Sequence, residues 1–582
     1  MRLSVMLAVS LADLAAPEGA VAASASVPSS SQNQPTPGQI ESTLPALPSL
    51  PQLKSAPLTA NPPPASTEVP PGGPTVTVTG FDITGNTVFD TATLQSQVAS
   101  YVGKDLTLAE LYKVAAVLTR YYQDHGYGIA RATLPEQQLS GGHVILQVVE
   151  GRVGKISVDG NTRTRSDAIF KQGSAVKSGQ IYTDAAMDRA SLLVNDLPAV
   201  QAQAVLSPGT DFGTADVTYK VTEDPRYSGL LSFDDYGRPD VGRWRLNGEA
   251  RVASPTGIGD RLVADVTHSE HDQLNFGALS YSLPVGADGG RLNASYNQSH
   301  YYVTGAFTDL GLSGGSRNAS LTYQFPEIRS QAINLYWGAG FEHQGSESIV
   351  NPFDPTTHKS LGGAKITGTE LNLLQLTGFF TRSHDDGSSY NLSGSFASNG
   401  ERNDGLKSSA ERARLELDAG FNKTFADTWA FISKASGVWS PDPLSDTEKF
   451  SLGGPDNVRG FPSADLRGDS GLFGSAEIQR SLAPAWPLAV GWYVDAGKAW
   501  TKQFSTVPAG CKLDTTPRSK TFNLCRSPQD ARGISSVGAE LIFQSPGKRW
   551  ESRLEWAYPI GGTRPSDGDE GGHVWATFGM NF

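Results

Sequence analysis

An arginine in a glycine-containing loop and an aspartate in a nearby strand have the clearest capacity for specific chemistry. Arg459 stands between Val458 and Gly460 in the run Gly-Pro-Asp-Asn-Val-Arg-Gly-Phe. Asp495 lies in Tyr-Val-Asp-Ala-Gly, where strand alternation places it on the polar face. A glycine-flanked arginine can fold inward and meet such a carboxylate, and a partly desolvated pair is stronger than a surface ion pair. On pattern alone, a solvated arginine and an unrelated aspartate remain the alternative.

The other candidates for chemistry are weaker. His268 and His271 have a spacing that suits a metal on a helix, but they lie at a strand end, which favours solvated loop residues. An acidic cluster near the C-terminus suits Ca²⁺ but is better explained as a solvated turn: Asp567, Asp569 and Glu570. The sequence has no P-loop, nucleophile elbow or metalloprotease helix. We therefore expect no enzymatic activity, no metal site and no cofactor.

Composition excludes several classes of protein. Apolar residues make up 38% of the 582 residues, and no stretch approaches the roughly 20 apolar residues of a membrane-spanning helix. The net charge of −12 argues against a nucleic-acid partner, and two cysteines cannot build a disulfide-rich scaffold. Residue types are also distributed unevenly. Of the 36 prolines, 14 precede residue 75, whereas all ten tryptophans lie between Trp244 and Trp575.

The N-terminal region divides into two segments. Residues 1–25 combine a basic start, a short apolar run and a final Ala-Ser-Ala, which predicts a secretory signal, although two acidic residues interrupt the segment. The alternative is an unstructured N-terminus. Residues 26–73 are rich in proline and serine, and they cannot bury enough apolar surface to offset the entropy of ordering. We predict an extended linker there.

Two copies of a small unit follow, at residues 74–150 and 151–224. The run Ile-Thr-Gly-Asn-Thr at 83–87 returns about 75 residues later as Val-Asp-Gly-Asn-Thr at 158–162. Each run follows an alternating strand, precedes two helical stretches and is completed by further strands. This pattern predicts two α+β domains of the same topology; two unrelated small domains are the alternative.

Residues 225–582 alternate between apolar and polar side chains in strand after strand. Soluble sandwiches alternate as well, but a polar face this heavily charged suits a water-filled lumen, and Trp and Tyr near strand ends suit membrane interfaces. We therefore predict a mainly β protein whose transmembrane antiparallel β-barrel has about sixteen strands. The predicted strands are 227–235, 243–253, 260–268, 273–283, 290–302, 316–325, 331–343, 365–382, 387–398, 410–423, 428–440, 470–481, 487–498, 532–544, 549–559 and 573–582.

Connections after even-numbered strands are short, and those after odd-numbered strands are often long. Short periplasmic turns and long external loops produce this asymmetry in outer-membrane barrels. One long connection, 501–531, contains Cys511 and Cys525. An external loop is oxidising, so we expect these cysteines to form a disulfide; a metal pair or free thiols are the alternatives.

The Val-Arg-Gly-Phe motif that ends at Phe461 and the Asp-Ala-Gly motif that ends at Gly497 resemble those of a known family. Together with the paired α+β units, they make residues 74–582 similar to TpsB transporters of two-partner secretion, the haemolysin-activator and FhaC-like family. The resemblance implies that the units are periplasmic POTRA domains, which can hold an unfolded client by β-augmentation. The barrel, in the Gram-negative outer membrane, would conduct that client to the cell surface.

The resemblance also implies partners and site roles. The client would be a secreted TpsA-like exoprotein such as an adhesin, cytolysin or haemophore, and the other partners outer-membrane lipid and the barrel-assembly machinery. Arg459 and Asp495 would lock their loop inside the lumen, and Phe582 would end a sorting signal. Family members commonly carry an amphipathic plug helix, but three prolines interrupt residues 39–54 and argue against a long one.

The rival interpretations make different predictions. The Val-Arg-Gly-Phe motif also occurs in barrel-assembly proteins, so an insertase of other barrels is the alternative function; it predicts more than two POTRA copies and many clients. A passive porin leaves the repeats unexplained.

Overall fold

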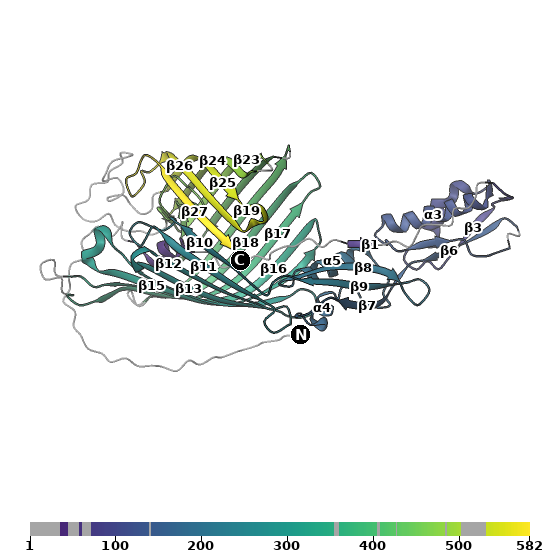
Figure 1. Ribbon diagram of the computed structural model, residues 1–582, viewed down its shortest axis with the longest axis horizontal. Coiled ribbons are helices and arrows are strands. Elements are labelled where there is room, and N and C mark those ends of the chain that lie inside the picture. Colours follow the sequence, from purple (N-terminus) through teal and green to yellow (C-terminus); the bar gives the residue numbers. More distant parts are fainter. Residues whose placement is uncertain are drawn as a thin grey trace.

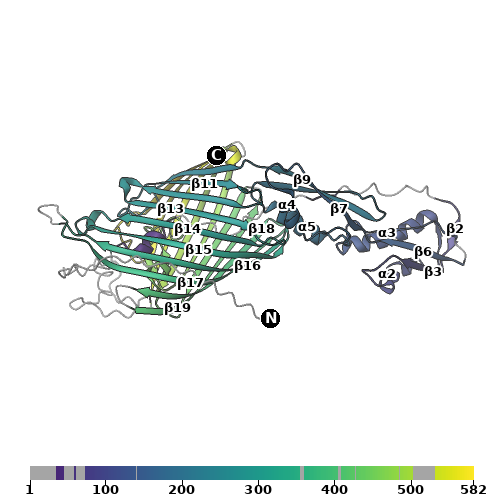
Figure 2. The same cartoon turned by 90° about the horizontal axis from the view of Figure 1, so that it is seen from below.

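The computed structural model describes residues 35–44, 58–60, 72–138, 141–353, 360–403, 408–426, 428–483, 486–501 and 531–582. The predicted signal segment, most of the predicted linker, and both Cys511 and Cys525 lie outside these ranges. A large barrel carries two small α+β units that extend from one of its ends (Figures 1 and 2). Within the described ranges, no helix is long and apolar enough to cross a membrane.

The first α+β unit packs two helices against a three-stranded sheet in the order β3-β6-β5. Thr107 caps helix α3 with a capping box, since its hydroxyl accepts from Glu110 N–H and the Glu110 carboxylate accepts from Thr107 N–H. The face of α3 with Leu111, Val114 and Leu118 is fully buried. The elements are β2 (Thr75–Thr77), β3 (Gly80–Thr84), α2 (Thr91–Val98), η1 (Ala99–Tyr101), β4 (Asp105–Thr107), α3 (Leu108–Asp124), β5 (Arg131–Thr133) and β6 (His143–Val149).

The second unit repeats the order strand, two helices, two strands. Thr183 caps its longer helix by accepting from Ala186 N–H. Its sheet has the order β1-β8-β9-β7, so the predicted linker contributes β1 (Leu58–Ala60), which runs parallel to β8. The elements are β7 (Arg152–Asp159), α4 (Ser166–Gln172), α5 (Asp184–Asn195), β8 (Val200–Pro208) and β9 (Thr214–Glu223).

A carboxylate at the end of the last strand closes each copy of the repeat. Glu150 accepts from the backbone N–H of Thr87 at 2.5 Å, and Glu223 accepts from Thr162 Oγ1 at 2.5 Å and Thr164 N–H at 2.7 Å. Burial alone would raise the pKa of Glu223, but these hydrogen bonds outweigh it and lower the pKa to about 2. The repeated Gly-Asn-Thr run is therefore a turn clamped by a distant carboxylate.

The glycine of that run has a structural requirement in both copies. Gly85 and Gly160 have φ angles of 81° and 86°, and a Cβ on either would overlap a backbone carbonyl oxygen, of Val148 or Val221 respectively. Only glycine combines this conformation with this close approach.

The larger part of the chain forms a closed antiparallel barrel of sixteen strands, as predicted. Its middle strands are longer than predicted; β16, for instance, continues to Val350 through residues assigned to a loop. The strands are β10 (Tyr227–Asp234), β11 (Arg245–Ala253), β12 (Arg261–Ser269), β13 (Leu274–Pro284), β14 (Arg291–Tyr302), β15 (Leu312–Arg329), β16 (Ile333–Val350), β17 (Ala364–Ser383), β18 (Ser388–Asn403), β19 (Ser408–Phe425), β20 (Trp429–Trp439), β23 (Ser470–Ala483), β24 (Trp486–Trp500), β25 (Arg532–Gln544), β26 (Trp550–Gly562) and β27 (His573–Asn581).

Alternation along the strands separates the two faces of the barrel. In β24, Trp492 and Val494 are 49% and 45% exposed on the outer face. Asp495, the next residue after Val494, faces the lumen and is fully buried. An outer face of apolar side chains suits lipid, and an inner face with charges suits a hydrated pore. The inward position of Asp495 agrees with the parity of its strand.

The second α+β unit docks on the short-turn end of the barrel. Arg329, at the end of β15, makes a bidentate ion pair with Asp196, with both N–O distances 2.8 Å. Gly259 and Gly289, in two short turns, lie against Leu197 and Leu193 so closely that a Cβ on either glycine would overlap the leucine side chain. The α+β units and the short turns therefore lie on the same side of the membrane.

Two of the described segments occupy the lumen. The connection between β20 and β23 folds inward and contains η4 (Asp446–Glu448), β21 (Phe450–Leu452) and β22 (Leu466–Gly468), the two strands forming a small hairpin. The second segment is helix α1 (Pro37–Glu41), drawn in purple within the barrel in Figure 2. It corrects the prediction that residues 26–73 form only an extended linker. The helix spans five residues and ends before Pro45, consistent with the proline argument against a long helix.

Candidate functional site inside the barrel lumen

Residues 453–465, which we call the lumen loop, bring Arg459 to the inner wall of the barrel. Its guanidinium makes a bidentate pair with Asp495, with Nε–Oδ2 at 2.9 Å and Nη2–Oδ1 at 2.8 Å. The backbone N–H of Arg459 also donates to Asp495 Oδ2 at 3.3 Å. The structure thus brings together the two residues that the sequence singled out, across 36 positions. The planar guanidinium matches both carboxylate oxygens, so the pair fixes orientation as well as charge.

Further groups surround the same guanidinium. Nη1 lies 3.0 Å from Glu477 and 3.7 Å from Glu555, and Nη2 donates to Ser475 Oγ at 3.3 Å. The ring of Tyr493 stacks on its face, with Cζ 3.2 Å from the ring centroid. A buried cation is tolerated only where its donors find partners, and here the neighbours β23, β24 and β26 supply them. Sequence reasoning missed these four residues because alternation shows only that they point inward.

Apolar packing and two glycines fit the lumen loop to the wall. Val458 and Phe461, on either side of Arg459 and Gly460, are both fully buried in a cluster with Leu452. A Cβ on Gly460 would lie 2.6 Å from Ser536 Cβ, and a Cβ on Gly497 would lie 2.7 Å from Leu452 Cδ2. Gly460 therefore allows the lumen loop to approach the wall, and Gly497 leaves room for Leu452, the residue that precedes the loop.

Helix α1 is held in the lumen by residues of the β20–β23 connection that lie on either side of the lumen loop. Gly38 N–H donates to Asp446 Oδ2 at 2.8 Å, and a Cβ on Gly38 would lie 2.5 Å from Arg467 Nη2. The carboxylate of Glu41 accepts from Asn318 at 2.7 Å and from Gln344 at 3.2 Å. Ile40 is fully buried in an apolar cluster of the wall: Val241, Leu274, Tyr301, Val303 and Leu312.

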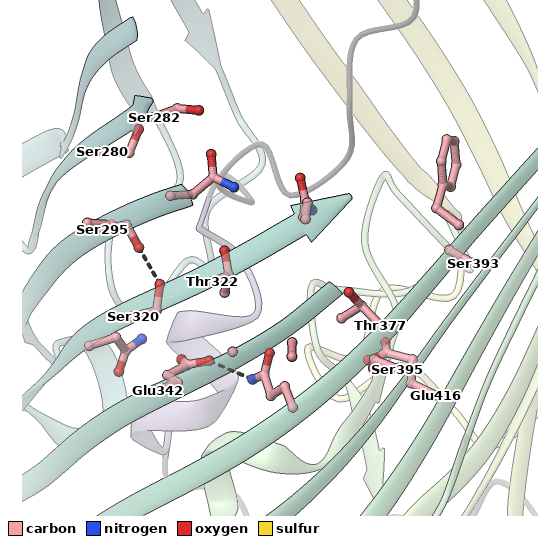
Figure 3. Close-up of a pocket in the computed structure, with 18 of the residues that line it drawn as sticks. Ser280, Ser282, Ser295, Ser320, Thr322, Glu342, Thr377, Ser393, Ser395 and Glu416 are labelled. Atoms are coloured by element: carbon pink, nitrogen blue, oxygen red, sulfur yellow. Dashed lines mark hydrogen bonds between the residues drawn. The ribbon is translucent and has the colours of Figure 1, made fainter. Parts of the chain in front are cut away.

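Below these segments the lumen contains a cavity of about 760 Å³. Figure 3 shows hydroxyl-bearing side chains of β13, β14, β15, β17 and β18 around it, with Ser295 and Ser320 joined by a hydrogen bond of 2.7 Å. The charged lining residues include Glu342 and Glu416. The lining therefore mixes hydroxyls, amides and charged groups with aromatic side chains such as Phe276, Tyr336 and Phe379.

The remaining candidates do not contact the Arg459 guanidinium. His268 faces Asn275 at 2.8 Å, and within the described ranges no group of three or more His, Cys, Asp or Glu side chains is placed to hold a metal ion. Asp567 pairs with His573 at 2.8 Å. Phe582 ends the barrel, and its backbone exchanges hydrogen bonds of 3.0 and 3.1 Å with Gly229. Its role as a sorting signal stays a prediction.

A closed sixteen-stranded barrel with an inward-folded loop, a lumenal helix and two POTRA-like units defines the class of outer-membrane polypeptide transporters. The family described as "Haemolysin secretion/activation protein ShlB/FhaC/HecB" matches residues 213–510, and "POTRA domain, ShlB-type" matches residues 76–151. The chain belongs to this ShlB/FhaC/HecB family of TpsB transporters. Its barrel accordingly lies in the outer membrane of a Gram-negative bacterium, with the POTRA region in the periplasm.

Individual relatives agree with this assignment. The chain is 25% identical over 464 residues to the "Heme/hemopexin transporter protein HuxB" of Haemophilus influenzae, covering 77% of each chain. It is 28% identical over 454 residues to the "Outer membrane transporter CdiB" of Escherichia coli, covering 74% of this chain and 73% of the relative. The solved structure of CdiB from Escherichia coli shares the fold, with a TM-score of 0.67 at 21% identity, over 89% of this chain and 93% of that one.

Proposed function

We propose that this protein holds an unfolded partner exoprotein on its POTRA units and conducts it through the barrel to the cell surface. The observation that carries the proposal is a polar, closed-walled lumen occupied by a loop and a short helix, neither of which is a barrel strand. Both can leave the pore without breaking the barrel. Sheet edges of the POTRA units would receive the extended client by β-augmentation.

The proposed client is a secreted TpsA-like exoprotein. Relatives with this architecture are named as transporters of haemolysin or of heme/hemopexin, so an adhesin, cytolysin or haemophore fits the same route. The apolar outer face would contact outer-membrane lipid, and the barrel-assembly machinery would insert the barrel. The outer membrane lacks ATP, so folding of the client outside the cell would supply the free energy of transport.

We further propose that Arg459 and Asp495 lock the lumen loop in the closed pore and position it for client passage. The bidentate pair, its full burial and the close approach at Gly460 support this role. Removing one partner of a buried pair leaves an uncompensated charge, which costs about 3–5 kcal/mol. The loop should therefore have one firmly held position until that pair breaks.

The experiment is comparative proteomics of the culture medium and cell surface from cells that lack the gene and are complemented with wild type or Arg459→Ala. Loss of one large secreted protein, restored only by wild type, supports client export and the lock. A broad fall in many outer-membrane barrels supports the alternative, an insertase. Full secretion by Arg459→Ala, with the barrel inserted, contradicts the lock while leaving the transport proposal intact.

A further inference from the structure

A second cavity, of about 410 Å³, lies between the second α+β unit and the periplasmic end of the barrel. The α+β unit contributes Leu193 and Leu197 to its lining, and the barrel contributes side chains of β11, β12 and β14. Five residues line both this cavity and the lumen cavity of about 760 Å³: Arg261, Ser282, Asn293, Gln324 and Tyr336. We call it the mouth cavity, because it lies where the POTRA units meet the interior of the barrel.

Two arginines in the lining of the mouth cavity lie on either side of Ser282, which is labelled in Figure 3. Strand register pairs Arg261 of β12 with Ser282 of β13. From the other neighbouring strand, β14, Arg291 Nε donates to Ser282 Oγ at 3.0 Å, and Arg291 Nη2 donates to the carbonyl oxygen of Gly259 at 3.2 Å. Two positive charges therefore face the same space, where they repel each other.

Among the described residues, neither arginine has a carboxylate partner. The guanidinium of Arg261 makes no hydrogen bond or ion pair with any of them, although its Nε is shielded from solvent. The neighbouring carboxylates already have partners: Asp196 pairs with Arg329 at 2.8 Å, Asp260 accepts from Tyr281 Oη at 2.6 Å, and Glu249 pairs with Arg251.

Other arginines of the lumen are neutralised by the protein itself. Their partners lie at 2.8 or 2.9 Å: Arg459 pairs with Asp495, Arg412 with Glu401 and Arg414 with Glu416. A guanidinium in a partly desolvated site is stabilised by an anion, and the protein supplies none to Arg261 or Arg291. A ligand that carries its own negative charge fits this pair of residues.

We propose that Arg261 and Arg291 form an anion site that captures carboxylate side chains of the client as it passes from the POTRA units into the lumen. The guanidinium fork matches the two oxygens of Asp or Glu. Side chains of an extended segment alternate between its two sides, so Leu193 and Leu197 can receive apolar residues of the same segment. This inference rests on the proposed function, because it names the chemistry of the segment that enters the pore.

Peptide binding to the full-length protein in phosphatidylcholine nanodiscs tests the site. The probe is a fluorescent peptide of about ten residues in which Glu alternates with Ala, and the control peptide has Gln in place of each Glu. We expect the Glu peptide to bind about tenfold more tightly than the Gln peptide. Because the attraction is between charges, added salt should weaken it.

Arg261→Gln is the decisive variant, because Arg261 has no partner among the described residues to lose. It should weaken the affinity for the Glu peptide about tenfold, with the thermal unfolding temperature unchanged, and adding Arg291→Gln should weaken the affinity further. Arg480→Gln is the matched control. Arg480 is exposed at the same end of the barrel, with its guanidinium 5.2 Å from the ring of Trp429, and its loss should leave the affinity unchanged.

Two results of the peptide titration overturn the anion site: equal affinity of the two peptides for the wild type, or equal affinity of the Glu peptide for the wild type and Arg261→Gln. Phosphatidylglycerol in the nanodiscs tests a different anion, the lipid phosphate. If this lipid abolishes the difference between the wild type and Arg261→Gln, the phosphate occupies the site and the proposal fails.

Export from cells connects the site to the client. Arg261→Glu with Arg291→Glu reverses the charge of the mouth, and it should lower client secretion several-fold at an unchanged level of inserted barrel. Unchanged secretion by this variant overturns capture of the client. If deletion of the gene changes no secreted protein, the transport proposal fails, whereas the peptide titration still decides whether the mouth binds carboxylates.

Discussion

The lumen loop and helix α1 fill the same pore, but opposite solutions to the burial of charge hold them there. The loop brings a cation to carboxylates, and its guanidinium finds Asp495 and Glu477 within 3.0 Å. Helix α1 brings a carboxylate, Glu41, to the amides of Asn318 and Gln344, and among the described residues no cation contacts it. The buried charge of Arg459 in the loop is neutralised by its carboxylate partners. Glu41 of helix α1 has no such partner among the described residues, so it must keep its proton or remain charged in a poorly solvated site.

This difference predicts closures of unequal strength. Breaking a buried, hydrogen-bonded ion pair costs about 3–5 kcal/mol, whereas a hydrogen bond between neutral groups contributes about 1 kcal/mol. The loop should therefore be the firm closure, and α1 the one that leaves first and responds to pH.

Substitution of the three carboxylates around Arg459 gives the largest expected effect. Asp495→Asn removes the bidentate partner and should accelerate hydrogen exchange in 453–465 on the order of a hundredfold. Glu477→Gln, which loses one contact of 3.0 Å, should have a smaller effect, and Glu555→Gln, at 3.7 Å, the smallest. Asp385→Asn in an exposed turn is the control. Equal effects at all three sites would show that general charge, and not the bidentate geometry, holds the loop.

Gly38→Ala extends the comparison to the helix. Its Cβ would overlap the carbonyl oxygen of Asp446 and lie 2.5 Å from Arg467, so α1 should be displaced. Overpacking typically costs 1–3 kcal/mol, which corresponds to about a thirtyfold shift toward the unplugged state. Channel recordings in planar bilayers would detect it as a higher open probability. Gly474→Ala, where a Cβ has nothing closer than 4.0 Å, should leave the recordings unchanged.

The smallest effect expected is a pH dependence that Glu41 carries. Burial, reinforced by the nearby carboxylates Glu342 and Glu448, raises the pKa of Glu41 to about 7, although Asn318 and Gln344 lower it in part. Because the pKa is higher in the seated helix than in the released one, seating takes up a proton. The stabilisation is complete below the ordinary pKa of 4.5 and is lost as the pH rises through about 7.

Raising the pH from 5.5 to 8 should therefore favour the unplugged state on the order of tenfold. The same bilayer recordings at several pH values measure it, and Glu41→Gln should flatten the profile. A Glu41→Gln variant that keeps the wild-type profile would assign the titration to another group.

Much of this architecture was predictable from local patterns. Period-two alternation located all sixteen strands, and the parity of β24 placed Asp495 in the lumen before any contact was known. The spacing of Thr107 and Glu110 is that of a capping box, a pattern visible in the sequence that coincides with the start of α3. In contrast, the extra length of β16 was missed, because alternation weakens in Gln-Gly-Ser-Glu-Ser beyond His343. Helix α1 was missed because its five residues carry too little periodicity to stand out in a proline-rich segment.

The sequence by itself determined the barrel, the repeated α+β units, the inward direction of Asp495 and the glycines beside Arg459, because each depends on neighbouring residues or on one strand's alternation. Only the tertiary structure decided which inward groups meet. Glu477, Tyr493 and Glu555 surround Arg459 because strand register sets them at one height in the lumen. Trp575 and Arg238 reach the same loop because closing the barrel brings the two ends of its sequence together, a proximity that no local pattern encodes.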